Sequence, residues 1–549
     1  SPVTLTRTVR VNTGNVVPDG CDAVIMIEDV LEKDDAFLIR AAAHPWQHIR
    51  PAGEDIAASE MILPKRTIIR PEDIGAMASY GISSVPVLDL RVALIATGSE
   101  IVPVGTMPGP GQVIESNMHM AQALLRSTGV SVTRYPIVPD DPDQIRSTVE
   151  EAALHHDIIL ISAGSSKGTR DYTAGVISGL GEVFIHGVGI KPAKPVIIGG
   201  IGGHLVIGMP GYPLACHTIL RELLLPLLDQ RGFPVPVQPE IPVHVTSTLH
   251  SEIGMDEFVL TTVGKIGDRW VAVPLSRGSG VQMSMVRSNA YLKIPASSEG
   301  IEAGEMTRAV LTVPEKRAGE VVLITGSHDP VIDHLADLVR GDGIRIASTH
   351  VGSMGGLRTI RQRDCHLAPM HLLSADGDYN REYLKKYLPD TEMILICVAE
   401  REQGVVSRDG LAFPDITSHS FINRQRGSGT RMLLDHLLAE NGISPEAIEG
   451  YDREVTTHLG VCLSVLNGEA DMGVAVYSAA HAYELSFTPI GTERYELVTT
   501  REIFETDFRV RSIAETLGSE GFKEILNKLG GYRTAESGVI RRCNQQHSD

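Results

Sequence analysis

Carboxylate and lysine side chains recur between residues 100 and 194 in loops of the kind that bind a phosphorylated substrate with a divalent cation. Glu100, Asp140 and Asp171 are carboxylates in loops that follow predicted strands. Mg²⁺ prefers such hard oxygen ligands, and substrate phosphates usually complete its octahedron. Lys191 and Lys194 would offset the negative charge of that substrate. The pattern therefore predicts a site for a divalent cation and a phosphate.

Glycines in the same loops would let an anion approach the backbone. Gly164 and Gly168 lack the side chains that would keep N–H groups away from a ligand. Simpler explanations exist for single residues, because Asp141 precedes a proline and suits a helix N-cap, and Glu100 alone suits an exposed surface. The prediction therefore depends on the order of the motifs rather than on any one residue.

An alternation of strands and helices is expected to position these loops. Helices are predicted after Ser116, Asp141 and Pro213. Strands are predicted at residues 92–96, 132–138, 157–162, 183–185 and 205–208. This order favours a mainly parallel sheet covered by helices, and ligands of such sheets bind beyond the carboxyl ends of the strands.

The regions on either side of this sheet have different patterns. The first 50 residues alternate short apolar runs with Gly, Pro and Asp, which favours β structure, and a helix is predicted over residues 71–80. A proline-rich stretch at 233–239 precedes alternating apolar and polar residues, and the strand–loop–helix pattern returns at 320. The predicted domains are residues 1–50, 51–88, 89–235, 236–316 and 320–549.

Charge and composition restrict the classes of partner. The chain has 549 residues, with 68 Asp and Glu against 49 Lys and Arg, and a formal net charge of −19. An acidic surface repels phosphate backbones, so nucleic-acid binding is not expected. No CxxC pair and no apolar run near about 20 residues occur, which disfavours a thiolate zinc site and a membrane span. We expect a soluble, cytoplasmic protein whose natural beginning precedes Ser1.

Two loops in the C-terminal part predict a second anion site. The stretches T-G-S-H-D-P at 325–330 and N-R-Q-R-G-S-G-T-R at 423–431 each precede a predicted helix. Free N–H groups at helix starts, with Ser and Thr hydroxyls, can hold a tetrahedral oxyanion without a metal. Alternatively, Ser327 is a helix cap, and Arg426 and Arg431 are solvated surface charges. The predicted oxyanion ligands are Thr325, Ser327, Arg426, Ser428, Gly429 and Thr430.

The order of motifs over residues 1–316 resembles the molybdopterin molybdenumtransferase family, the MoeA type, which includes the E domain of gephyrin. Residues 12–14 with 18–24 are similar to the family's TGAPLPEGADAV stretch, and 50–56 to its RxxGEDI stretch. The remaining matches are 96–100 with STGDEL, 162–172 with SGGVSVGxxDY, 190–195 with MKPGKP and 208–213 with GLPGNP.

The resemblance implies a reaction and assigns roles to residues by position. It implies insertion of molybdate or tungstate into adenylylated molybdopterin, with release of AMP and with Mg²⁺ as cofactor. It implies metal and oxyanion contacts for Glu100, Asp140 and Asp171, and phosphate contacts for Lys191 and Lys194. It also implies a homodimer, with the molybdopterin adenylyltransferase and molybdoenzyme chaperones as partners. The implied cofactor-binding residues are Thr13, Thr97, Gly98, Ser162, Gly164, Ser166, Gly168, Pro210 and Gly211.

Residues 320–549 resemble two-lobed, periplasmic-binding-protein-like domains that are fused to such transferases, which implies capture or sensing of the oxyanion. The expected fold is therefore a multidomain α/β protein. It has a β-rich N-terminal part, a molybdopterin-binding α/β sheet domain, a small β-barrel-like domain and a two-lobed C-terminal α/β domain.

Several positions depart from the family pattern. The family's SxMDGYA segment, with an active-site Asp, is absent before Ser1; Ser99 stands where an Asp is usual, and Tyr212 where an Asn is usual. An alternative hypothesis is therefore that the protein is catalytically impaired and instead binds molybdate or tungstate or acts as a regulator. A third hypothesis is a general sensor of sulfate, phosphate or an organic anion.

Overall fold

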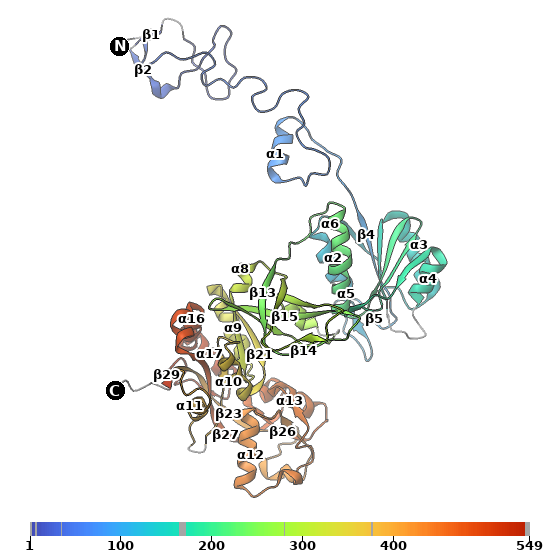
Figure 1. The fold of residues 1–549 in the computed structure, drawn as a ribbon, viewed down its shortest axis with the longest axis vertical. Helices are drawn as coiled ribbons and strands as arrows, with labels where there is room; N and C mark the ends of the chain where they lie inside the picture. Colours follow the sequence, from blue (N-terminus) through green and yellow to red (C-terminus); the bar gives the residue numbers. More distant parts are fainter. Residues whose placement is uncertain are drawn as a thin grey trace. The chain divides into compact units, whose positions relative to one another are not determined.

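The computed structural model describes residues 3–5, 8–34, 36–163, 172–278, 280, 282–374 and 377–543. The chain divides into two compact units, Ser1–Asp89 with Arg231–Pro234, and Leu90–Gln230 with Val235–Asp549 (Figure 1). None of the helices in the described ranges is long and apolar enough to cross a membrane.

The described residues of the first unit form a small antiparallel sheet and one α-helix. The sheet has the order β1 (Val3–Leu5), β3 (Ala36–Ile39) and β2 (Val30–Lys33). Helix α1 (Pro71–Ser79) has a proline in its first turn, and the Asp73 carboxylate accepts the N–H of Arg70 at 2.9 Å. The predicted helix over 71–80 is confirmed.

The second unit begins with the predicted, mainly parallel sheet, whose order is β7-β4-β8-β12-β11-β9. Strands β4 and β8 are continuous apolar runs buried on both faces, as parallel strands covered by helices usually are. Strand β11 runs in the direction opposite to that of the other five strands of this sheet. The strands are β4 (Arg91–Ala96), β7 (Ser131–Arg134), β8 (Ile158–Ala163), β9 (Glu182–His186), β11 (Ile197–Ile201) and β12 (His204–Pro210).

Helices cover both faces of this sheet, with α3 and α4 on one side and α2, α5 and α6 on the other (Figure 1). The Asp141 carboxylate accepts the N–H groups of Asp143 and Gln144 at 3.0 Å each, which confirms the predicted N-cap of α3. The helices are α2 (Asn117–Arg126), α3 (Pro142–His155), α4 (Tyr172–Leu180), α5 (Pro213–Ile219) and α6 (Leu225–Gln230), and a π-helical segment (Leu220–Leu224) joins the last two.

A closed β-barrel follows. Its pairings run β13–β16, β16–β15, β15–β17, β17–β19 and β19–β13, so the ring has no free edge. Apolar side chains such as Val243, Val263 and Leu292 fill it. Short helices α7 (Gln282–Arg287) and α8 (Glu315–Gly319) adjoin it. The strands are β13 (Glu240–Val245), β15 (Asp256–Ile266), β16 (Arg269–Pro274), β17 (Ala290–Ile294) and β19 (Met306–Leu311).

Short strands add detail at the edges of these domains. Strand β10 (Ile190–Lys191) pairs in parallel with β15 of the barrel. Strand β5 (Ile101–Val102) pairs with β6 (Val113–Ile114), and β14 (Leu249–His250) pairs with β18 (Gly300–Ile301). Through β10, a segment of the α/β domain therefore continues the sheet of the barrel.

The C-terminal part has the expected two-lobed α/β fold. Long antiparallel strands β23 (Met393–Ser407) and β27 (Ser486–Thr500) run from the first lobe into the second. The first lobe adds β20 (Val321–Gly326), β21 (Arg345–His350), β22 (Ala368–Met370), β28 (Tyr532–Arg533), β29 (Ile540–Cys543), α9 (Val331–Leu338), α10 (Gly352–Gln362), α11 (Arg381–Tyr387), α15 (Arg501–Thr506), α16 (Phe508–Gly518) and α17 (Glu520–Leu529). The second adds β24 (Phe421–Arg424), β25 (Glu454–Val455), β26 (Met472–Val476), α12 (Gly429–Glu440), α13 (His458–Leu466) and α14 (Tyr477–Ala482).

The first lobe and the barrel share one apolar core. Ile266, Val271 and Val273 of the barrel belong to the same buried cluster as Leu323 of β20. The approach is close, because a Cβ on Gly264 would lie 2.8 Å from Cγ of Leu323. The C-terminal domain is therefore docked on the barrel by direct core packing rather than joined by a free linker.

Candidate functional site

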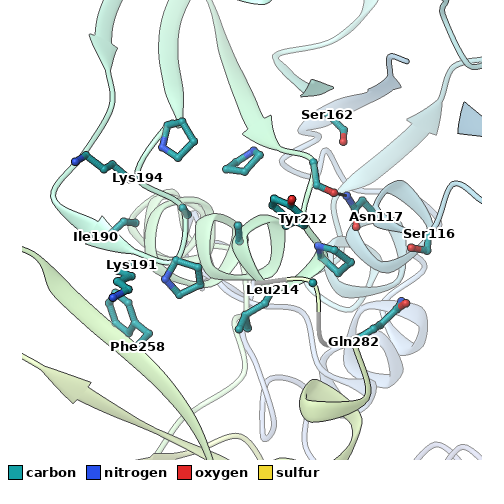
Figure 2. A pocket seen from close by; sticks show the side chains of 18 of the residues that line it. Ser116, Asn117, Ser162, Ile190, Lys191, Lys194, Tyr212, Leu214, Phe258 and Gln282 are labelled. Atoms are coloured by element: carbon teal, nitrogen blue, oxygen red, sulfur yellow. Dashed lines mark hydrogen bonds between the residues drawn. The ribbon is translucent and has the colours of Figure 1, made fainter. Parts of the chain in front are cut away.

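A cavity of 1020 Å³ in the second unit collects most of the described residues that the sequence predicts for the molybdopterin site. The ends of β4, β8 and β12, the starts of α2 and α5, and loops of the barrel form its wall (Figure 2). Its volume lies at the upper end of the range for small-molecule sites, so a large cofactor precursor would fit. The predicted residues that line it are Thr97, Glu100, Ser162, Lys191, Lys194, Pro210 and Gly211.

Lys191 is held by carboxylates of the barrel. Its Nζ lies 3.4 Å from the Glu252 carboxylate and 3.8 Å from that of Glu257. Glu257 is buried and also accepts hydrogen bonds from Arg277 at 2.5 Å and from Ser251 at 3.0 Å. The pairing of β10 with β15 places Lys191 opposite Glu257. A buried carboxylate network therefore positions this ammonium group on the cavity wall.

Lys194 differs from Lys191 in being exposed, with no ion pair to any described residue. Figure 2 shows both lysines on one side of the cavity and Ser116, Asn117 and Ser162 on the other. The cavity can therefore contact an elongated ligand at two ends, with cations at one of them.

Asn117 at the start of α2 was not predicted as a site residue. Its Nδ2 donates to the carbonyl of Gly211 at 2.6 Å, and its Oδ1 is buried without a partner among the described residues. The neighbouring Glu115 is also buried and accepts the N–H of Met118 at 2.6 Å. The only signal in the sequence was the predicted helix start at Ser116, whose side chain makes no capping hydrogen bond.

Of the three predicted metal ligands, the structure describes Glu100 and Asp140. Glu100 lines the cavity, whereas Asp140 does not; instead, its carboxylate accepts the N–H of Ser99 at 3.3 Å. Gly98 is also not on the cavity wall. Asp171, Gly164, Ser166 and Gly168 lie outside the described residues, and Thr13 belongs to the first unit.

The donor set on the cavity wall is compatible with Mg²⁺. Within the described ranges, no group of three or more His, Cys, Asp and Glu side chains is arranged to hold a metal ion, so the trio with Asp171 stays a prediction. Glu100 and the unpartnered Oδ1 of Asn117 both belong to this cavity and are hard oxygen donors. One or two protein oxygens completed by substrate phosphates are typical of Mg²⁺ sites.

The predicted oxyanion loops of the C-terminal domain separate into buried and exposed residues. The hydroxyl of Ser327 lies 2.7 Å from Nε2 of His371, and the Ser428 side chain caps α12 by accepting the N–H of Arg431 at 3.2 Å. Arg426, in contrast, has a side chain that is 78% exposed and paired with Asp452 at 3.2 Å. Arg426 therefore lies at the surface, apart from the buried part of the loop.

The remaining predicted residues of these loops are buried. Thr430 accepts a hydrogen bond from the Gln403 amide at 3.2 Å. A Cβ on Gly429 would lie 2.2 Å from Nδ1 of His371, so only glycine fits there. Thr325 is buried, and its hydroxyl has no partner among the described residues.

A buried ion network at the centre of this domain was not predicted from the sequence. Arg401 on β23 pairs with Asp329 and with Glu493. Burial alone would raise the pKa of Glu493, but Arg401 and His371 outweigh it and lower that pKa to about 2. Burial, followed by the proximity of Arg401, lowers the pKa of Arg424 to about 9.

Comparisons with known families agree with this architecture. The chain matches family models described as the MoeA N-terminal region (domains I and II) over residues 1–81, a probable molybdopterin binding domain over 93–230 and the MoeA C-terminal region (domain IV) over 242–311. A model of a PBP superfamily domain matches residues 336–518.

Individual relatives are similar over the first part of the chain. A Methanocaldococcus jannaschii protein named for molybdopterin biosynthesis is 31% identical over 317 residues, which are 56% of this chain and 77% of that protein. A molybdopterin molybdenumtransferase of Staphylococcus aureus is 29% identical over 322 residues, 57% of this chain and 76% of that one. The crystal structure of a Pyrococcus horikoshii MoeA protein has 32% identity and a TM-score of 0.45, and the match covers 54% of this chain and 73% of that one. The chain belongs to the MoeA family of molybdenum cofactor biosynthesis proteins and carries an additional domain of the PBP superfamily.

Proposed function

We propose that this protein inserts molybdate, or tungstate, into adenylylated molybdopterin and releases AMP. The observation that carries the proposal is the 1020 Å³ cavity, whose wall contains Glu100, Lys191 and Lys194 together with two helix starts. Membership of the MoeA family supports molybdopterin as the bound group. An adenylylated pterin is long and carries a phosphoanhydride, which suits a cavity with cations at one end.

The residues on the cavity wall have distinct tasks in this proposal. Lys191 and Lys194 bind phosphate or oxyanion oxygens, and preorganised cations of this kind stabilise the charge that develops on a leaving phosphate. Glu252 and Glu257 hold the Lys191 ammonium until an anion displaces part of that contact. The starts of α2 and α5 lie on the cavity wall, and the positive end of a helix dipole favours phosphate oxygens there.

Glu100 and Asn117 are the described residues that would hold Mg²⁺. When bound, the ion would supply positive charge to neutralise the phosphoanhydride. Asp140 and Asp171 remain predictions for the same role, as do the pterin contacts of Thr13 and of residues 164–168. We also propose that the C-terminal domain captures the oxyanion substrate, a role supported by its match to the PBP superfamily.

The proposal predicts that AMP release depends on Lys191. The 549-residue chain is incubated with adenylylated molybdopterin, Mg²⁺ and molybdate, and AMP is quantified. Lys191→Gln is expected to lower kcat/KM by about 100-fold, because one preorganised cation at a leaving phosphate contributes roughly that much. Lys316→Gln, which removes an ammonium on α8 outside the cavity, is the matched control and should leave the rate unchanged.

A second candidate function is binding of molybdate or tungstate without transfer. Tyr212 favours it, because this ring lines the cavity, is 62% exposed and is larger than the asparagine usual at that position. If the wild-type chain releases no AMP while Tyr212→Asn restores release, the transferase proposal is wrong for the natural sequence and the binding function takes its place.

A further inference from the structure

Arg424, at the end of β24, is a buried cation without a carboxylate partner in the described part of the chain. Its residue is 1% exposed, and no Asp or Glu of the described residues forms an ion pair with it. Its Nη2 donates to the carbonyl of Thr456 at 3.0 Å, whereas its Nε and Nη1 have no partner among the residues described. A buried charge without compensation is strongly destabilising, so the site is suited to receive an anion.

Two histidines beside Arg424 supply further hydrogen-bond donors. His458, at the first position of α13, is fully buried, and neither ring nitrogen has a partner in the described part of the chain. His328, 6% exposed, follows β20, and its ring centroid lies 6.2 Å from that of His458. Burial lowers the pKa of both rings, so each is neutral and carries one N–H donor.

Both lobes contribute to this cluster. His328 comes from the first lobe, where it follows β20. Arg424 and His458 come from the second lobe. The nearby Arg401 has its charge balanced by Asp329 and Glu493, so Arg424 carries the uncompensated charge. A ligand here would contact both lobes at once.

The β-barrel brings a third cation to the same place. Arg287, at the end of α7, is exposed and acts electrostatically on both His328 and His350, whose rings lie 4.4 Å apart. Helix α7 begins at Gln282, which lines the cavity described above. One short helix therefore extends from the wall of that cavity to the C-terminal cluster.

We propose that Arg424, His328 and His458, together with Arg287 of the barrel, form a composite binding site for a small, doubly charged tetrahedral oxyanion. The proposal rests on the capture role proposed above and names its residues and ligand class. Molybdate, tungstate, sulfate and phosphate share this chemistry. Cationic and neutral N–H donors from both lobes and the barrel, with no carboxylate partner for Arg424 among the described residues, distinguish this site from the exposed loop around Arg426.

Calorimetric titration of the full-length chain tests the site. Sodium tungstate, molybdate, sulfate and phosphate are titrated separately into wild type and variants, all carrying Lys191→Gln and Lys194→Gln so that cavity binding does not contribute. Arg424→Met should raise the Kd of the tightest oxyanion by about 100-fold, because it removes charge-assisted hydrogen bonds to the anion. His458→Phe should raise it by about 10-fold.

Two further variants sharpen the comparison. Arg287→Gln should weaken binding less than Arg424→Met, and its effect should diminish as salt concentration rises, because Arg287 is exposed. Arg408→Gln removes another exposed cation of the second lobe and is the matched control with unchanged Kd. The oxyanion with the lowest Kd identifies the source of the ligand.

The outcomes separate this proposal from the transferase proposal. Absence of binding for all four oxyanions overturns the site, as does a wild-type Kd in both Arg424→Met and His458→Phe, or loss of binding only in Arg426→Gln. Without ligand, the melting temperature of Arg424→Met should equal or exceed that of wild type if the cation serves a ligand; a large decrease would mean a structural role. AMP release is measured independently, so its failure leaves the binding result intact.

Discussion

Ala193 lies between the two cavity lysines in a backbone conformation that favours glycine. Its φ is +100° and its side chain is buried. A Cβ in the left-handed region costs roughly 1–2 kcal/mol, and burial of one methyl group returns about 0.8 kcal/mol. The turn that presents Lys191 and Lys194 is therefore held in place at some cost to stability.

Ala193→Gly should leave the free energy of unfolding unchanged or raise it by up to about 1 kcal/mol, because relief of the left-handed conformation offsets the lost methyl group. The same substitution at Ala153, within α3, should lower it by about 1 kcal/mol, because glycine is unfavourable inside a helix. Urea denaturation of both variants measures the difference. A larger decrease in the free energy of unfolding for Ala193→Gly than for Ala153→Gly would contradict this prediction.

Residue types and their spacing in the sequence predict some residues of each site but not others. Lys191 and Glu100 occur in ordered motifs and were predicted, and both line the cavity. Asn117 and Arg424 were not predicted. Both are buried with side-chain atoms that have no partner among the described residues, a property that arises only after distant segments pack. Arg426, two residues from Arg424, has the same side chain in an exposed position.

Strands that are continuous apolar runs could be predicted from the sequence. Strands that form only because another strand pairs with them could not. The runs in β4 and β8 indicate buried parallel strands. Strand β11 was missed because Gly199 and Gly200 interrupt its pattern; they pack closely, since a Cβ on Gly199 would lie 2.6 Å from the carbonyl of Glu182. Strand β10 exists only because β15, much later in the chain, lies beside it.

The contact between β15 and β20 predicts a strong effect at Gly264. Gly264→Ala should lower the free energy of unfolding by about 1–3 kcal/mol, because the added methyl group would lie 2.8 Å from Cγ of Leu323 and 3.0 Å from the carbonyl of Val321. Gly491→Ala, in strand β27 with open space around the new Cβ, is the matched control. Equal melting temperatures for the two variants in thermal unfolding would contradict the close packing of the barrel and the first lobe.

At the scale of the whole second unit, one interface lies between the C-terminal domain and the barrel, and His366 connects the two. Its Nδ1 accepts the N–H of Leu323 at 2.9 Å, and its Nε2 lies 2.9 Å from the carbonyl of Lys265. Arg509 also donates to the Lys265 carbonyl, at 2.9 Å. Burial, followed by the charge of Arg509, lowers the pKa of His366 to about 4. The neutral ring is therefore part of the interface.

Acid should weaken this interface. Because the pKa of His366 is depressed from 6.5 to about 4, its contribution to stability is complete above about pH 6.5 and is lost as the pH falls through 4. The loss from this residue is up to about 3 kcal/mol. Thermal unfolding between pH 7 and pH 4 should show the decrease. His366→Asn, which keeps an acceptor but does not titrate, should be less stable at pH 7 and have a flatter pH profile; an equally steep profile would assign the decrease to other groups.

The long strands β23 and β27 have a consequence for how the added domain can move. They connect the lobes, and their pairing shifts register beside Cys397 and beside Gln403. The shift beside Cys397 lies within the first lobe, because β29 and β28 pair with β23 on either side of it. The first lobe is anchored to the barrel through their common core, so a bend beside Gln403 would move the second lobe alone. A ligand held between the lobes would then shift only the outer lobe and leave the shape of the 1020 Å³ cavity unchanged.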